Sequence, residues 1–268
     1  MNGVIVIDKP ADFTSFDVIA VLRGILKMKK IGHSGTLDPK ATGVLPVFVG
    51  EATKLTDYLP DDEKTYEAEL TLGISTDTED IWGKVLEEKM PVVSKESIEE
   101  AVLSFEGVYD QVPPMYSAKK IHGKKLYEYA REGKEIEREP VRVTIRSISI
   151  QRIELPRVSF TVTCSKGTYI RTLCTDIGKK LGLPACMSAL RRTKHGRFSS
   201  DDAHTLQEVE NCVKNGRTGD VLIPVSSLFD YPKCITDETG DKLLMNGNRL
   251  SNEHLSAPVR GLIRVYDS

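Results

Sequence analysis

The sequence lacks the features that define several common protein classes. Its 268 residues contain no Pro/Gly/Ser-dominated tract, which excludes collagen-like and other low-complexity architecture. The longest apolar runs, 4–7 and 44–49, fall far short of the roughly 18 residues that a membrane-spanning helix needs. The N-terminal MNGVIVIDKP has no basic leader ahead of an apolar core, so it does not resemble a signal peptide. We therefore expect a cytoplasmic protein that has no membrane partner.

Cysteine is scarce and irregularly spaced. The five cysteines are odd in number and form no C-x-x-C pair, which argues against a disulfide framework and against a structural zinc site. A glycine-rich nucleotide-binding loop is missing as well. We expect reduced, mostly buried thiols, no bound metal and no cofactor.

An excess of one charge sign is also missing. The chain has 37 Lys and Arg against 39 Asp and Glu, a formal net charge of -2, which by itself argues against a nucleic-acid binder. The distribution is uneven, however: residues 57–110 sum to -12 (16 acidic, 4 basic), 164–197 to +7 (8 basic, 1 acidic), 117–146 to +4 (9 basic, 5 acidic) and 1–56 to +2 (7 basic, 5 acidic). A fold that joins the positive segments would present a basic face to phosphates. Solvated helix faces would explain the same counts, so charge alone leaves both interpretations open.

Periodicity predicts an alternation of strands and helices. Residues 64–72 alternate as a strand that turns Tyr66 toward the same side as its apolar residues. Thr14 to Asp17 resembles a capping box that begins a helix, and Gly182 ends another helix over 169–181. Further strands are expected at 4–8, 44–49, 141–153, 158–164 and 185–198, and further helices after Ser94 and at 125–132, 206–213 and 241–245.

The segment best suited to chemistry is the loop Gly32–Gly43, which joins three glycines and a proline directly ahead of an apolar strand. Such a loop can approach a ligand closely from a rigid scaffold. Asp38 is its one carboxylate. An Asp-Pro pair is most often a turn signal, so a lone carboxylate does not by itself establish an active site.

The loop sequence GHSGTLDPKATGVLPV resembles the catalytic loop of the bacterial tRNA pseudouridine-55 synthases, the TruB-type pseudouridine synthases. The similarity continues in order along nearly the whole chain, through the blocks KPADFTSFDV, KTY, TDTED, VPPMYSAKKIHGKKLYEYAREG, SKGTYIRTL and LRR. The resemblance implies an isomerase that detaches uracil from one uridine in the T-arm of tRNA, rotates the base and rejoins it through carbon. The target nucleotide must then be flipped out of its stack into a pocket.

The same resemblance assigns catalytic residues. Asp38 matches the family's catalytic aspartate and Arg171 the arginine that pairs with it. Tyr66 matches the tyrosine that stacks on the target base, a candidate for removing the C5 proton. Whether Asp38 acts as nucleophile or base stays open. Judged from the residues alone, Arg171 could instead contact a phosphate, and Tyr66 could be a core tyrosine.

Further matches concern RNA binding. His33 corresponds to the histidine that the family inserts among the T-loop bases, and Asp80 to an acidic residue that contacts flipped bases. Tyr169 and Leu190 correspond to residues that line the uracil pocket. As alternatives, His33 could be a hydrogen-bonding group of its loop, and Leu190 could be an ordinary core residue.

The resemblance also implies a domain organisation. Residues 1–230 match the catalytic domain, and 231–268 resemble only the beginning of a small RNA-binding β-barrel of the PUA type. The polar segment 111–140 matches the family's mobile insert that closes over the RNA arm, with Lys119 and Lys120 among its basic residues. The implied fold class is α/β (α+β), with a mixed, mostly antiparallel sheet flanked by helices. We expect a monomer whose partner is tRNA.

Three alternatives remain at this stage. The block GHSGTLDPK also resembles the guide-RNA-dependent pseudouridine synthases of archaea and eukaryotes. A non-catalytic RNA-binding module could use the same basic segments. A glycoside hydrolase is the third alternative, although that chemistry needs two carboxylates that flank the bond.

Overall fold

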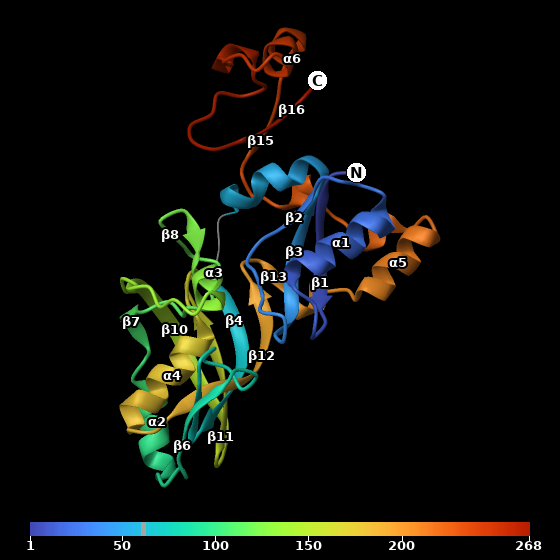
Figure 1. The fold of residues 1–268 in the computed structure, drawn as a ribbon. Coiled ribbons are helices and arrows are strands. Elements are labelled where there is room, and N and C mark those ends of the chain that lie inside the picture. Colours follow the sequence, from blue (N-terminus) through green and yellow to red (C-terminus); the bar gives the residue numbers. More distant parts are fainter. Residues whose placement is uncertain (60–62) are drawn as a thin grey trace. The chain divides into compact units, whose positions relative to one another are not determined.

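The computed structural model describes residues 1–59 and 63–268 and divides them between two compact units, Met1–Leu222 and Ile223–Ser268. Each unit is described by itself (Figure 1). No helix of the described residues is long and apolar enough to cross a membrane.

A large sheet organises the first unit. Its strands follow in space the order β1 (Gly3–Lys9), β3 (Thr42–Val49), β12 (Ala185–His195), β4 (Lys64–Leu72), β11 (Arg157–Cys164), β10 (Val141–Glu154) and β7 (Gly107–Gln111), while β2 (Ile31–His33) pairs with β3 and β13 (Phe198–Ser199) with β12. Neighbours in this series are antiparallel, except for β3 and β12, which are parallel. The parallel joint is short, with Arg191 opposite Thr42 and Arg192 opposite Gly43. The mixed, mostly antiparallel sheet expected from the sequence is therefore confirmed.

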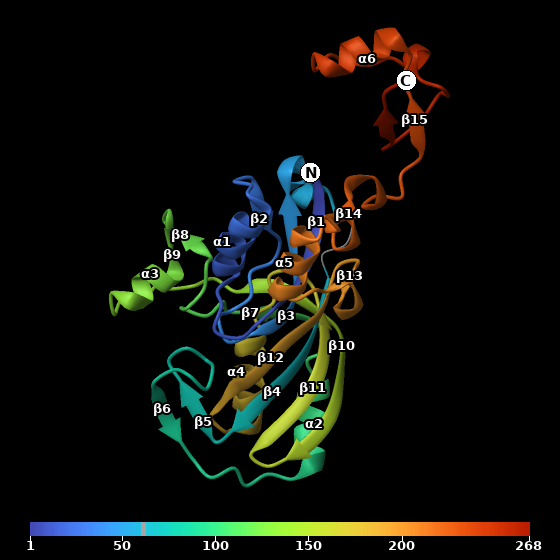
Figure 2. The ribbon, with the colours of Figure 1, turned by 90° about the vertical axis from the view of Figure 1, so that its right-hand side faces the viewer.

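Two pairs of helices pack against different parts of this sheet (Figures 1 and 2). Helices α1 (Ser15–Leu26) and α5 (Leu206–Lys214) contact each other near β1 and β2. Helices α2 (Lys95–Leu103) and α4 (Ile170–Leu181) contact each other and the β10, β12 and β4 part of the sheet. The sheet thus has a β1–β3 half and a β12–β4–β11–β10 half, each with its own helices, joined by the short parallel contact.

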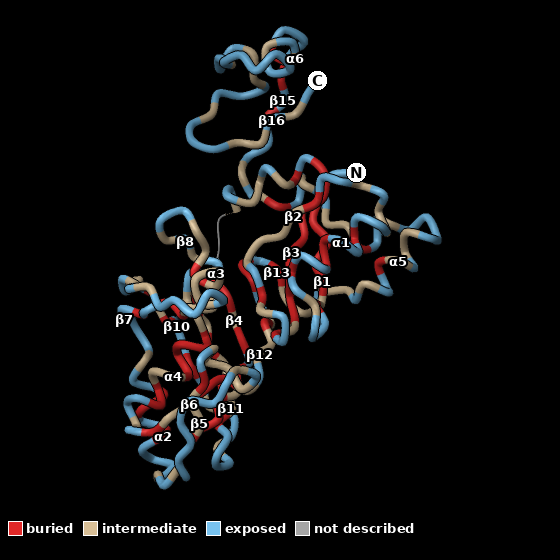
Figure 3. Tube along the Cα trace, in the orientation of Figure 1, coloured by how far each residue is buried: buried red, intermediate tan, exposed pale blue. Residues whose placement is uncertain are grey.

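The core follows from the alternation of the sequence. In β4, Tyr66, Ala68 and Leu70 point to the buried side, as the period of two predicts. Helix α4 buries Leu173, Cys174 and Ile177, which recur at helical spacing. Figure 3 shows the buried residues concentrated along the sheet strands.

Local signals set several element ends. Thr14 and Asp17 form the capping box that the sequence predicts at the start of α1. Gly182 ends α4 in the left-handed conformation, with a φ of 67°.

The chain also forms two hairpins that periodicity did not indicate. One pairs β5 (Ile74–Thr76) with β6 (Val85–Glu88), and the other pairs β8 (Lys120–Ile121) with β9 (Lys124–Lys125) and is followed by α3 (Leu126–Arg131). Short 3-10 helices occupy Gly50–Tyr58, Ser200–Asp202 and Thr218–Asp220.

The second unit is small. It contains β14 (Ile223–Pro224), α6 (Glu238–Met245), 3-10 helices at Val225–Ser227 and Asn252–His254, and the parallel pair of β15 (Lys233–Ile235) with β16 (Arg264–Tyr266). Helix α6 begins three residues before the expected Asp241, because the side chain of Asp237 accepts a hydrogen bond from the Gly240 amide at 2.7 Å and caps the helix.

Candidate active site

The loop that carries Asp38 lies between β2 and β3, and a buried lysine forms a hydrogen bond to its backbone. The ammonium of Lys9, at the end of β1, donates hydrogen bonds to the carbonyls of Phe13 at 2.6 Å, Pro10 at 2.9 Å and Pro39 at 3.0 Å. Lys9 has no exposed surface. Burial lowers the pKa of Lys9 to about 8, while the negative charge of Asp38 acts in the opposite direction. Lys9 therefore fixes the residue directly after Asp38.

A buried arginine holds the two ends of the same loop. Arg192, in β12, donates from Nε to the carbonyl of Val44 and from Nη2 to the carbonyl of Gly35, both at 2.8 Å. Its side chain is fully buried. The backbone of Arg192 also packs against Gly43, where a Cβ would lie 2.1 Å from the Arg192 carbonyl oxygen and where φ is 100°. Glycine is required at position 43 by both space and conformation.

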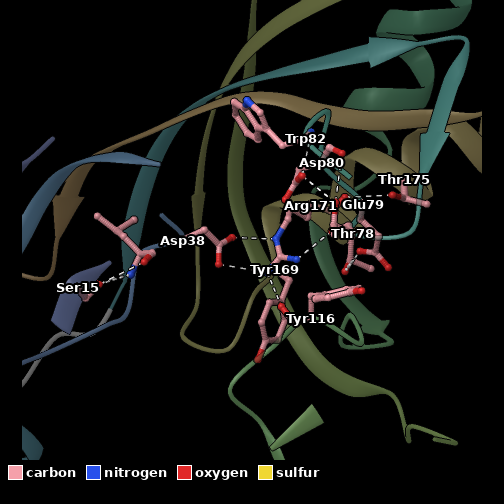
Figure 4. A network of polar contacts seen from close by, with 12 residues as sticks. Ser15, Asp38, Thr78, Glu79, Asp80, Trp82, Tyr116, Tyr169, Arg171 and Thr175 are labelled. Atoms are coloured by element: carbon pink, nitrogen blue, oxygen red, sulfur yellow. Dashed lines mark hydrogen bonds and ion pairs between the residues drawn. The ribbon is translucent and has the colours of Figure 1, made fainter. Parts of the chain in front are cut away.

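Asp38 and Arg171 form an ion pair between the two halves of the sheet (Figure 4). Arg171, at the start of α4, has its Nε 2.8 Å from Oδ2 of Asp38 and its Nη2 3.3 Å from Oδ1. The arginine side chain is 5% exposed, whereas the aspartate side chain is 39% exposed. Both carboxylate oxygens are thus held by a rigid guanidinium, while the open side of the carboxylate can face a ligand.

Arg171 also donates hydrogen bonds to two main-chain carbonyls. Nη1 donates to the carbonyl of Thr78 at 3.0 Å, and Nη2 donates to the carbonyl of Tyr116 at 2.9 Å. Thr78 belongs to the turn between β5 and β6, and Tyr116 belongs to the segment 111–140. The guanidinium therefore links the Asp38 loop, the hairpin turn and the insert.

Tyr66 lies in β4 opposite Arg192 of β12 and is 6% exposed. Burial raises the pKa of Tyr66 to about 12, and the charge of Asp38 adds to the rise, whereas the neighbouring Arg192 opposes it. The phenol is therefore protonated at neutral pH. Leu190 is half-buried and lies in β12, two residues before Arg192. It pairs with Ala68 of β4, which is two residues after Tyr66 and on the same face of that strand.

Tyr169 occupies the N-cap position of α4, two residues before Arg171, without a capping hydrogen bond from its side chain. The side chain of Gln111 holds its backbone from both sides, since Oε1 accepts from the Tyr169 amide at 2.8 Å and Nε2 donates to the Tyr169 carbonyl at 3.0 Å. Figure 4 shows the Tyr169 ring beside Arg171 and Asp38. The structure therefore gathers Asp38, Arg171 and Tyr169 in one place.

The other predicted residues differ in how they are connected to the Asp38–Arg171 pair. Asp80 accepts at Oδ1 from the Thr78 hydroxyl at 2.8 Å, and so is joined to Arg171 through Thr78. The Nδ1 atom of His33, in β2, is buried without a hydrogen-bond partner. Burial lowers the pKa of His33, and Arg192 adds to the lowering. Lys119 and Lys120 lie at the β8–β9 hairpin, and neither side chain takes part in the described hydrogen bonds of Asp38 and Arg171.

Sequence reasoning missed three residues that build the site: Lys9, Arg192 and Ser15. Buried Ser15 bonds both backbone atoms of Leu37, accepting from its amide at 2.9 Å and donating to its carbonyl at 3.2 Å. The sequence positions of the two cations could have indicated burial, because Lys9 ends an apolar strand and Arg192 shares a strand face with Leu190. The charge counts instead included both cations as surface charge.

Metal ligands do not gather within residues 1–59 and 63–268, where no group of three or more His, Cys, Asp or Glu side chains could hold an ion. The described cysteines are free thiols, four of them buried.

Comparison with known proteins gives two family matches that follow each other along the chain. Residues 23–170 match the N-terminal domain of TruB family pseudouridylate synthases, and residues 171–230 match the C-terminal domain of tRNA pseudouridylate synthase B.

Curated relatives and solved structures agree with these matches. The chain is 51% identical to tRNA pseudouridine synthase B of Alkaliphilus oremlandii over 260 residues, covering 95% of this chain and 85% of the relative. It is 46% identical to the protein of that name from Clostridium kluyveri, covering 99% and 92%. A Cbf5-Nop10-Gar1 complex contains a chain that is similar in structure, with a TM-score of 0.73, 29% identity and coverage of 95% and 70%. A chain in an H/ACA RNP bound to a substrate RNA is also similar, with a TM-score of 0.71 and 26% identity. This match covers 99% of the present chain and 74% of the other.

Proposed function

Because the chain belongs to the TruB family of pseudouridylate synthases, we propose that it converts uridine 55 in the T-arm of tRNA to pseudouridine. Activity as a tRNA pseudouridine synthase follows from the family and from relatives of 44–51% identity. The T-arm position is the finer part of the proposal, and the collinear sequence blocks from KPADFTSFDV to LRR support it.

The observation that carries the proposed chemistry is the Asp38–Arg171 pair. Its arginine is buried and its carboxylate is held at both oxygens but is still accessible. Such a group can act on the ribose or the base of a nucleotide flipped out of its stack. The product contains the same atoms as the substrate, and the reaction transfers no electrons, so the proposal includes no cofactor and no metal.

Tyr66 is proposed to stack on the flipped uracil and to receive the proton that leaves C5 after the new carbon–carbon bond forms. Its pKa of about 12, raised mainly by burial, keeps the phenol protonated in the resting enzyme. Tyr66 must therefore release its own proton in the same step. The Asp38 carboxylate, whose charge acts on Tyr66, is the proposed acceptor. N1 of the uracil, which lost its bond to the ribose, then takes up one proton, so that the proton lost from C5 is balanced and the carboxylate is ionised again.

The other predicted residues are proposed to bind RNA around this centre. Tyr169 and Leu190 would line the uracil pocket, Asp80 would contact a flipped base, and the insert with Lys119 and Lys120 would close over the arm. His33 would enter the T-loop as a neutral ring, since burial lowers its pKa.

The proposed organisation keeps 1–230 as the catalytic domain and 231–268 as a partial PUA-like segment. We also propose that the enzyme acts as a monomer in the cytoplasm on free tRNA. A guide-RNA-dependent enzyme is not favoured, because the relatives at 44–51% identity are named as tRNA enzymes, whereas the similar chains in the RNP structures are 26–29% identical.

The variant Asp38→Asn tests the proposal. We expect it to bind an unmodified T-arm hairpin as the unaltered enzyme does but to form pseudouridine at least about a thousand times more slowly, because the amide can act neither as nucleophile nor as base. Chemical mapping of pseudouridine in the hairpin measures the reaction, and filter binding measures affinity. Asp57→Asn, at an exposed aspartate, is the matched control and should react normally. Pseudouridine formation by Asp38→Asn at the normal rate would contradict the proposed role.

A further inference from the structure

The single tryptophan of the sequence, Trp82, is on the surface. Its residue is 47% exposed, in the turn between β5 and β6. Tryptophan is a large, mostly apolar side chain that is highly buried on average, and at surfaces it is enriched where a protein binds a partner. An exposed indole beside an active site therefore raises the question of what covers it.

The turn that carries Trp82 is firmly built. The Trp82 amide donates to Oδ1 of Asp80 at 3.1 Å, and the Lys84 amide donates to Oδ1 of Asp77 at 2.7 Å. At Gly83 a Cβ would lie 2.2 Å from the Thr78 hydroxyl, so the chain after the tryptophan packs against the turn itself. The backbone on both sides of Trp82 is thus fixed, and the indole is held outward with little backbone freedom to lose on binding.

The same turn is attached to the catalytic pair. The Thr78 carbonyl accepts the 3.0 Å hydrogen bond from Arg171, and Arg171 holds Asp38. Figure 4 shows the turn from Thr78 to Trp82 beside the guanidinium. On the other side, Nζ of Lys40, two residues after Asp38, lies 6.0 Å from the centroid of the Trp82 ring. The same ammonium pairs with the exposed carboxylate of Asp12, and a phosphate can replace this carboxylate because exposed ion pairs are weak. The indole is therefore placed between the turn and the Asp38 loop, with a cation alongside.

We propose that Trp82 is a stacking platform for an RNA base next to the target uridine, and that Lys40 contacts the adjoining phosphate. This inference rests on the proposed function, since it assumes that RNA occupies the Asp38–Arg171 site. An aromatic face accepts any base, and a neighbouring ammonium fits the negative backbone that accompanies each base. A rigid turn joined to Arg171 would set the spacing between the stacked base and the reacting one.

Another exposed apolar residue lies on the same hairpin: Leu86, in β6 and four residues after Trp82, is 65% exposed. A protein partner would cover Leu86 together with Trp82, because apolar interfaces are broad. A single base, by contrast, has the dimensions of one indole and would leave Leu86 free. The cation beside the ring and the bond to Arg171 favour the base, and Leu86→Ala becomes the control that separates the two.

The test uses the intrinsic fluorescence of Trp82, which is the sole indole and so reports on this position alone. The full-length Asp38→Asn enzyme is titrated with an unmodified T-arm hairpin, so that the RNA stays unreacted. We expect quenching of the emission on binding. In the same background Trp82→Ala and Trp82→Leu should weaken hairpin binding about ten-fold, the size of one base–aromatic stack, whereas Trp82→Phe should recover most of the affinity and Leu86→Ala should bind normally.

Hairpins with one abasic nucleotide each then identify the base. At one T-loop position, base removal should weaken binding to the enzyme that retains Trp82 but cost nothing further in Trp82→Ala, because the two changes delete the same contact. The inference is wrong if the emission is unchanged by RNA, if Trp82→Ala binds normally, or if Leu86→Ala weakens binding equally. Should the unaltered enzyme modify the hairpin while Trp82 variants bind it normally, only this inference fails. Absence of pseudouridine from the hairpin would instead refute the proposed T-arm activity.

Discussion

The loop that carries Asp38 and the insert 111–140 are held in opposite ways. Residues from other elements fix the loop: Lys9, Arg192 and Ser15 are all buried, and all bond to its backbone or flanks. The described ion pairs of the insert lie within the insert, where Glu132 pairs with Lys124 and Lys134, and Glu135 with Arg138. The loop is anchored by buried side chains of other elements, whereas the insert bonds to the site through Gln111 at its start and through the Tyr116 carbonyl.

This difference separates two tasks. A group that reacts must be held to within a fraction of an ångström, and buried hydrogen bonds from rigid strands supply that precision. A surface that takes up an RNA arm needs charge and shape, and its exposed ion pairs add little to stability. The hydrogen bond from Arg171 to the Tyr116 carbonyl joins the insert to the guanidinium that holds Asp38.

The largest effect is expected where the anchoring is deepest. Arg192→Met should lower the free energy of unfolding by about 3–5 kcal/mol, because it leaves the buried carbonyl of Val44 and the partly buried carbonyl of Gly35 without their donor. Its neighbour provides the control: Arg191 pairs with Asp8 at 3.0 Å, and its side chain is 39% exposed. Arg191→Met should cost less than about 1 kcal/mol. Urea unfolding measures both, and equal losses would show that the loop is not anchored through Arg192.

A smaller effect is expected from the titration of Lys9. Its pKa falls from 10.5 to about 8 on burial, so between these pH values the unfolded chain binds more protons than the folded one. Stability attributable to Lys9 therefore rises with pH across this window, by at most about 1.4 kcal/mol per pH unit, and is lost as the pH falls to 8. Unfolding of the unaltered protein and of Lys9→Met at pH 7.5, 9 and 10.5 measures the difference. A constant difference between the two proteins would mean that Lys9 stays charged.

The smallest effect is expected in the insert. Glu132→Gln removes the partner of Lys124 and Lys134, both of which are at least one-third exposed. We expect no change in the melting temperature beyond the error of the measurement, because exposed ion pairs gain little over hydration. Glu135→Gln is a second variant of the same kind. A loss comparable with that of Arg192→Met would erase the contrast between loop and insert.

Much of the fold could be predicted because it depends on local patterns. The alternation in 64–72, the capping box at Thr14 and the glycine at 182 each define an element through neighbouring residues. The hairpin of β5 and β6 was missed because its strands are short and β6 is fully exposed, so no apolar period marks it. Its turn is specified by polar side-chain contacts that periodicity does not detect.

The site is harder to predict than the elements. Asp38 and Arg171 are 133 positions apart, and only the strand order brings them together, so the residues alone gave no reason to pair them. The charge counts were also partly misleading. Lys9, Arg171 and Arg192 contributed to the positive segments, but all three are buried and donate to carbonyls or to Asp38. A basic face of the kind that the charge counts suggest would therefore have to consist of the other cations.

The short parallel joint between β3 and β12 has a consequence for folding order. It joins the half of the sheet that supplies Asp38 to the half that supplies Arg171, through two residue pairs. Contacts across such long sequence separations form only after the entropy of closing the intervening chain has been overcome. Either half folded alone would contain one member of the pair. The assembled carboxylate and guanidinium are thus a marker of complete folding, and a chain stalled with its halves undocked lacks the Asp38–Arg171 pair.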